Sequence, residues 1–160
     1  MDVDGVGRHD LVAGAELADR SGAVWVVSGP NVTGDVDSLF ADATVVGAEE
    51  GDSLGARVAG LADHDGDGTG DLLLSAIGAD PHGESSGRVL LAYGRLSGTV
   101  DVADLVHFDG GIPGYLGYGL ADGSFDLTGD GVRDLLFGAP GPDGDVAASG
   151  SGYLLPGAAP

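Results

Sequence analysis

The sequence contains no cysteine and no lysine, and only six of its 160 residues are basic. Without cysteine, the chain can form neither disulfides nor thiolate metal sites. Twenty-six acidic residues give a formal net charge of −20. This charge opposes binding to nucleic acid or to an anionic membrane, because both need clustered positive charge on the protein. Divalent cations or a basic protein surface are the partners that fit it.

Long apolar runs and helical periodicity are missing as well. No stretch approaches the roughly 18 apolar residues of a membrane-spanning helix, so no membrane insertion is expected. The N-terminal segment MDVDGVGRHD lacks the basic start and apolar middle of a signal peptide. The 42% hydrophobic content can still supply the core of one domain, and 32 glycines favour short strands joined by tight turns. Almost no helix is expected.

Three segments of the chain repeat one pattern. Each begins with an aspartate-rich loop, continues with an apolar run (LVAGA, LLLSAIGA or LLFGA), and reaches a second strand-like segment after a glycine-rich gap. The last aspartates of the loops, Asp10, Asp71 and Asp134, lie at intervals of 61 and 63 residues. We interpret the chain as a single domain, 1–160, made of three units: approximately 1–50, 51–111 and 112–160.

Further strands complete each unit. The second segments read GAVWVVSG, GRVLLAYG and SGYLLPG; the strands ATVVGAEE and LVHFDGG follow the first two, and one strand precedes the second and third loops. A period near 60 residues with about four short strands is typical of a β-propeller blade. The sequence therefore predicts an all-β fold of about ten short antiparallel strands, or two and a half blades. A β-sandwich with similar strands is the alternative.

The second loop has the donors of a calcium site. In a tight glycine-rich loop, carboxylates at positions 1, 3 and 5 can converge on one ion, position 7 adds a carbonyl and position 9 a closing carboxylate. These donors are Asp63, Asp65, Asp67, the carbonyl of Thr69, and Asp71. Without a cation, two carboxylates ~4 Å apart repel by about 4 kcal/mol near a protein surface. This repulsion disfavours the alternative of a solvent-facing turn that binds no ion. An EF-hand would place its closing carboxylate at position 12, which is Leu74 here.

The other two loops offer fewer carboxylates. The third contains Asp126, the Thr128 hydroxyl, Asp130, the Val132 carbonyl and Asp134. The first contains Asp2, Asp4, the Arg8 carbonyl and Asp10, with Val6 at position 5. We expect calcium affinity to fall from the second loop to the third and then the first, and solvent-facing turns remain the alternative, most openly for the first loop.

Together these motifs resemble the FG-GAP repeats of the integrin α-subunit β-propeller and of many bacterial surface proteins. GAP is intact at 138–140, FG appears as Leu54-Gly55 and Leu116-Gly117, and the full Asp-x-Asp-x-Asp-Gly-x-x-Asp pattern occurs at 63–71. The resemblance implies calcium in a hairpin loop between the first two strands of a blade. It also implies a non-enzymatic adhesion or protein-binding role, extracellular or at a bacterial cell surface.

The partial blade count raises the question of assembly. A closed propeller has roughly four to eight blades, and exposed sheet faces and edges are a liability. The chain is therefore expected either to be an excerpt of a longer propeller or to form a homo-oligomer, for which a homodimeric ring is our hypothesis. The second functional interpretation is a purely structural segment, or a non-catalytic appendage of a larger secreted enzyme.

One motif suggests catalysis. GDSLG at 51–55 matches a Gly-x-Ser-x-Gly elbow, and DLVH at 104–107 mimics the Asp-x-x-His of GDSL hydrolases. An elbow needs a strand-to-helix turn, a base and an oxyanion hole. Ser53 instead occupies the FG element of its repeat, where the next unit has Tyr115, so the chain is not expected to be an enzyme.

Overall fold

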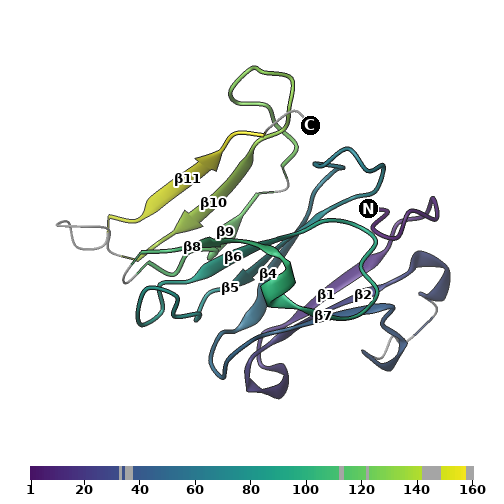
Figure 1. The fold of residues 1–160 in the computed structure, drawn as a ribbon, viewed down its shortest axis with the longest axis horizontal. Coiled ribbons are helices and arrows are strands. Elements are labelled where there is room, and N and C mark those ends of the chain that lie inside the picture. The colour runs from purple at the N-terminus through teal and green to yellow at the C-terminus, as the bar shows by residue number, and fades with distance from the viewer. Residues whose placement is uncertain (33, 35–37, 112–113, 122, 142–148, 158–160) are drawn as a thin grey trace.

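The computed structural model describes residues 1–32, 34, 38–111, 114–121, 123–141 and 149–157 (Figure 1). Within these ranges the chain forms eleven strands in three sheets and no α-helix, which confirms the all-β prediction. Four 3-10 turns lie in the connections: Ala18–Arg20, Gly29–Asn31, Ser38–Phe40 and Val102–Asp104.

The three sheets follow one another along the chain. The first has the order β1 (Leu11–Ala15), β2 (Ala23–Val27), β3 (Ala43–Val46) and β7 (Gly98–Asp101). The second has the order β4 (Leu54–Gly60), β5 (Leu72–Ala76), β6 (Arg88–Ala92) and β8 (Val106–Asp109). The third has the order β9 (Gly119–Leu120), β10 (Leu135–Ala139) and β11 (Ser151–Leu155). The repeated loops thus precede equivalent strands: β1, β5 and β10.

Strand β7 departs from the predicted unit boundaries. It belongs by sequence to the unit 51–111, yet it completes the first sheet, where it pairs in parallel with β3. The other strand pairs are antiparallel. An uncovered β3 would present a row of unpaired N–H and C=O groups, and the excursion between β6 and β8 covers that edge. This strand was not expected from the sequence, where it is represented only by the short segment GTVD.

Strand β5, in the interior of the second sheet, is buried on both faces. All five residues of β5 are buried. Leu72 and Leu74 pack into a cluster with Val24 and Val45 of the first sheet, whereas Leu73 packs with Phe137 of the third. Because neighbouring strand residues point to opposite faces, a strand covered on both sides must be apolar throughout. This explains the unbroken leucine run after the second loop.

The FG elements join neighbouring blades through backbone contacts. Leu54 and Leu116 form isolated parallel bridges with Gly22 and Gly87, which precede β2 and β6. Both glycines have positive φ, +87° and +80°, and a Cβ at either would meet the backbone of the bridged leucine. The repeated glycine therefore provides the close approach between consecutive sheets.

Replacement of this glycine should destabilise the protein more than its φ alone requires. For Gly87→Ala we expect a loss of at least ~2 kcal/mol in the free energy of unfolding, of which a left-handed backbone accounts for ~1–2 kcal/mol. The matched control is Gly98→Ala, since Gly98 has φ +64° but no atom within 4 Å of its would-be Cβ. Urea unfolding measures both, and equal losses would refute the contact between blades.

Candidate metal centre

The three aspartate loops lie at the same end of the strands (Figure 1). Each curls at two glycines with positive φ, at positions 4 and 6 of the loop. In the second loop these are Gly66 (φ +82°) and Gly68 (φ +89°). The equivalent pairs, Gly5 with Gly7 and Gly129 with Gly131, have φ between +77° and +88°. Since L-residues rarely adopt this conformation, the glycine spacing sets the path of all three loops.

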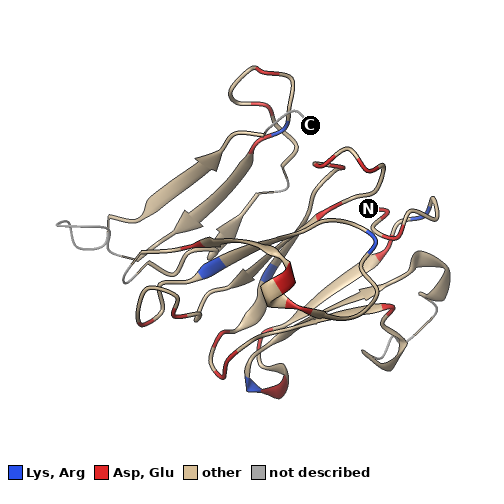
Figure 2. Ribbon diagram, viewed as in Figure 1, with Lys and Arg blue, Asp and Glu red and all other residues tan. Residues whose placement is uncertain are grey.

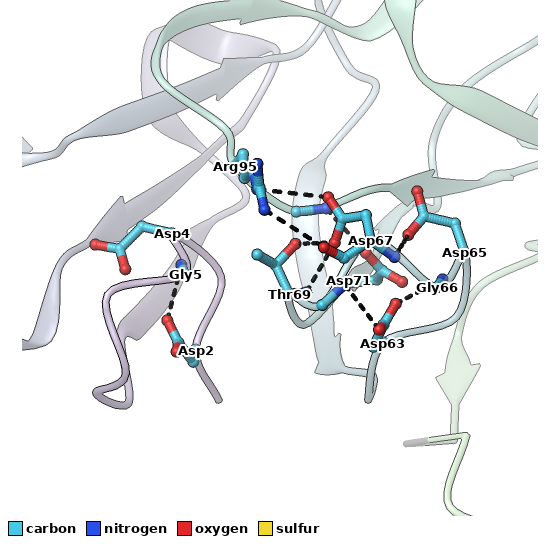
Figure 3. Close-up of polar contacts among 12 residues, drawn as sticks. Asp2, Asp4, Gly5, Asp63, Asp65, Gly66, Asp67, Thr69, Asp71 and Arg95 are labelled. Atoms are coloured by element: carbon cyan, nitrogen blue, oxygen red, sulfur yellow. Dashed lines mark hydrogen bonds and ion pairs between the residues drawn. The ribbon is translucent and has the colours of Figure 1, made fainter.

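The first aspartate of each loop holds this curl. Asp63 accepts hydrogen bonds from the N–H groups of Gly66 (2.7 Å) and Gly68 (2.9 Å) (Figure 3). Asp2 and Asp126 accept the corresponding bonds from the glycines of their own loops, at 2.6–2.8 Å. These bonds orient the carboxylate toward the inside of the loop.

The last aspartate closes the loop and ties it to its blade. Asp71 is fully buried; one carboxylate oxygen accepts the His64 N–H (2.7 Å), and the other accepts the N–H of Gly94, which follows β6 (2.8 Å). Asp10 and Asp134 repeat this arrangement, with Gly29 and Gly157 donating at 2.9 Å each. The closing carboxylate therefore connects the loop to the end of the second strand of each repeat.

The surroundings of the two buried closing carboxylates differ. Burial raises the pKa of Asp71, and the negative charges of Asp65 and Asp63 add to this against the lowering by its two N–H donors. At Asp134, hydrogen bonds dominate, first the one from the Gly157 N–H, and they hold the pKa below its ordinary value. In the absence of a cation, ionisation of the closing carboxylate is thus opposed in the second loop and favoured in the third.

Three carboxylates converge in each loop. Within each group, one oxygen per residue lies within 4.8 Å of the others. The groups are Asp2, Asp4 and Asp10; Asp63, Asp65 and Asp71; and Asp126, Asp130 and Asp134. Because calcium binds oxygen at ~2.3–2.6 Å, two of its ligands can stand up to about 5 Å apart, so each group fits one ion. The first loop forms its group despite Val6 at position 5.

Asp67 lies apart from these groups. Its carboxylate accepts the Thr69 N–H (2.7 Å) and the Thr69 hydroxyl, and it forms an ion pair with Arg95 (3.6 Å) (Figure 3). The Thr69 hydroxyl, the Thr69 N–H and the charge of Arg95 all hold the pKa of Asp67 below its ordinary value. In the third loop, the Thr128 hydroxyl lies 3.4 Å from both Asp126 and Asp134. The carbonyls of Arg8, Thr69 and Val132 stay predicted ligands.

The glycines that receive the closing aspartates were not identified as site residues from the sequence. A Cβ at Gly29 would meet the His9 carbonyl oxygen, at Gly94 the Thr69 side chain, and at Gly157 the Arg133 carbonyl oxygen. Each position therefore excludes a side chain and leaves its N–H free to reach the carboxylate. The sequence does mark these glycines, because the segments GAVWVVSG, GRVLLAYG and SGYLLPG all end in the glycine that donates to the closing aspartate.

The serine of the GDSLG motif has no catalytic surroundings in the part of the chain that the structure describes. Ser53 precedes strand β4, has φ +56°, and its hydroxyl donates to the Gly51 carbonyl (3.3 Å). Tyr115, its counterpart in the next repeat, has nearly the same φ of +53°. The position is a left-handed turn of the repeat that leads into a strand, not a strand-to-helix elbow.

Comparison with known proteins identifies relatives. No family model matches the chain. Integrin alpha-IIb of Homo sapiens is 33% identical over 155 residues, and integrin alpha-IIb of Mus musculus is 31% identical over 153 residues. The chain is a homologue of integrin α subunits. Each match covers 88% of the chain and 14% of the integrin, so the chain spans about a seventh of the length of these relatives.

This homology confirms the resemblance drawn from the FG, GAP and loop motifs, and it assigns the stacked sheets to a β-propeller fold. No helix among the described residues is long and apolar enough to cross a membrane. Figure 2 shows acidic residues at both ends of the strands with few basic residues among them. The integrin α homologue thus carries its carboxylate groups within a strongly negative surface.

Replacement of Gly94 should damage the second loop. In Gly94→Ala, the new Cβ would displace Thr69 and the Gly70 carbonyl, and the hydrogen bond to Asp71 would be strained. We expect a loss of about 1–3 kcal/mol in the free energy of unfolding, the usual cost of leaving a buried polar group unsatisfied. Gly111→Ala is the control, since its would-be Cβ has no neighbour within 4 Å. Equal stability of the two variants in urea unfolding would contradict this role.

Proposed function

We propose that the chain is a calcium-binding, integrin-α-like propeller module for protein–protein interaction or cell adhesion. The observation that carries the proposal is the threefold recurrence of three converging carboxylates in a loop of fixed glycine spacing. The homology to integrin alpha-IIb supports the propeller architecture and the interaction role. The same relationship supports an extracellular or cell-surface location and a role without catalysis.

The donor set suits calcium better than softer metals. Each group supplies only oxygen ligands, and calcium prefers six to eight oxygens in an adaptable shell. Asp63, Asp65 and Asp71 would hold the ion in the second loop. Bound calcium would supply positive charge that offsets the mutual repulsion of these carboxylates and so stabilises the loop.

Calcium should therefore stabilise the folded protein. A site that binds only the native state adds ~2.7 kcal/mol at a calcium concentration one hundred times its Kd, so Tm should rise on addition of calcium and fall with chelator. Asp65→Asn and Asp130→Asn should each reduce this rise, because each removes one charge from a group. Differential scanning calorimetry measures the effect.

Glu84→Gln is the matched control, since it removes the same charge from an exposed position outside the three loops. It should leave the calcium-dependent rise in Tm unchanged. A Tm that calcium and chelator do not alter in the parent chain would refute calcium binding while leaving the propeller fold intact.

The face of the third sheet that points away from the second supports association with a further blade. Leu136 and Leu154, paired across β10 and β11, are 36% and 44% exposed. Their counterparts after the second loop, Leu73 and Leu91, are buried by the third sheet. A pocket of about 300 Å³ lies beside Leu136. It is lined by a row of glycines on the three strands, Gly119, Gly138 and Gly152.

We propose that a second copy of the chain supplies the missing cover, as in a homodimeric ring. Light scattering at micromolar concentration should then give twice the mass of one chain, and Leu154→Asp should lower it toward the monomer. Leu39→Asp is the control, because Leu39 is 86% exposed in a different part of the fold. A monomeric parent chain would overturn the dimer.

A further inference from the structure

Arg95 links the first two aspartate loops. Its guanidinium lies 3.6 Å from the Asp67 carboxylate and donates to the Asp67 carbonyl at 3.4 Å. Its own backbone N–H donates to the carbonyl of Val3 in the first loop, at 2.6 Å. Arg95 has φ +63°, a conformation that is unusual for a non-glycine residue. Figure 3 shows the side chain directed at Asp67 on the side that faces Asp4.

The third loop provides an internal comparison. Asp130 occupies the same loop position as Asp67 and likewise accepts an N–H two residues ahead, from Val132 at 2.8 Å. Asp130 nevertheless belongs to the converging group of its loop, whereas Asp67 does not. The sequences after the equivalent glycines differ: Gly29 is followed by Pro30, Gly94 by Arg95, and Gly157 by Ala158. Only the second repeat has a cation at this position.

We propose that Arg95 is an internal counter-ion that competes with calcium for the Asp67 carboxylate and so lowers the calcium affinity of the second loop. This inference rests on the calcium-binding function proposed above. Asp67 can complete the shell of the ion only by leaving Thr69 and Arg95, so the free energy of the ion pair with Arg95 adds to that of the Thr69 hydrogen bonds in opposing binding. The loop with the most carboxylates is thereby weakened by a residue 28 positions away from Asp67, which stands at position 5 of the loop.

The size of the effect follows from the exposure of the pair. The side chains of Arg95 and Asp67 are 65% and 33% exposed, so water screens their attraction. Exposed ion pairs contribute at most ~1 kcal/mol, which corresponds to roughly a fivefold change in a binding constant. Removal of the guanidinium should therefore raise the calcium affinity of the second loop roughly two- to fivefold.

The test isolates the second loop and then removes the arginine. Asp4→Asn with Asp130→Asn removes one converging carboxylate from each of the first and third loops and leaves every residue of the second in place. In this background, calorimetric titration with calcium chloride compares the calcium affinity of the chain that retains Arg95 with that of the Arg95→Gln chain. Arg95→Asn serves as a second variant that retains the fold, because asparagine tolerates positive φ better than most residues.

Two further variants assign the cause. Arg20→Gln removes the same charge from an exposed arginine that forms an ion pair with Glu50, and it should leave calcium affinity unchanged. Asp67→Asn should weaken binding more in the Arg95→Gln chain than in the chain that retains Arg95, because only there is the carboxylate released from the guanidinium. Such coupling is the signature of competition for one group.

Each outcome decides a separate point. A two- to fivefold rise in affinity with Arg95→Gln, absent with Arg20→Gln, supports the competition. Equal calcium affinity with and without the guanidinium would overturn it and leave calcium binding itself intact. Absence of calcium binding in both chains, and in the parent with all loops present, would overturn the proposed function and this inference together.

Discussion

The hydrogen bonds of the closing aspartates are the constraint on which the site depends. Asp10, Asp71 and Asp134 each join the start of a loop to the glycine that follows the second strand of the repeat. A carboxylate that is buried, as at Asp71 and Asp134, or half-buried, as at Asp10, needs donors to replace its lost water, and two or more backbone N–H groups do so in each case. The loop is therefore fixed to its own sheet before any metal is considered. The convergence of the remaining carboxylates follows from that attachment and from the glycine curl.

The loops and the packing between sheets are parts of one structure. The Gly70 N–H donates to the Asp2 carbonyl and the Arg95 N–H to the Val3 carbonyl, so the first loop is bonded directly to the second repeat. The Val3 side chain lies in the same apolar cluster as Leu72 and Leu74. A cation that orders either loop would therefore also order the contact between the first two sheets. This explains how a metal site can stabilise a stack whose sheets are only three or four strands wide.

Much of this arrangement could be predicted from the sequence because it repeats. The apolar runs after the loops became β1, β5 and β10, and the carboxylates at positions 1 and 9 became paired anchors in all three loops. Strand β7 could not be predicted, since its four residues pair with a strand more than fifty positions earlier and only the tertiary structure brings that edge to them. The separation of the Asp67 carboxylate from the converging group could not be predicted either, because it depends on contacts made in the folded structure. The loop motif shows neither that Thr69 hydrogen bonds to the Asp67 carboxylate nor that another connection brings Arg95 beside it.

The number of carboxylates in a loop is therefore an incomplete guide to its affinity for a cation. By that number the second loop should bind most strongly, yet burial and neighbouring charge raise the pKa of Asp71, and Asp67 is engaged by Thr69 and Arg95. In the third loop, hydrogen bonds hold the pKa of Asp134 low, and Asp130 already faces its partners. The free energy gained by a cation in each loop comes from the carboxylates that already converge. The free energy needed to release other carboxylates from their hydrogen bonds and ion pairs is subtracted from it. If calcium binds as proposed, the second and third loops should therefore lie closer in calcium affinity than their carboxylate numbers indicate, because Arg95, delivered by the connection after the second strand, engages Asp67.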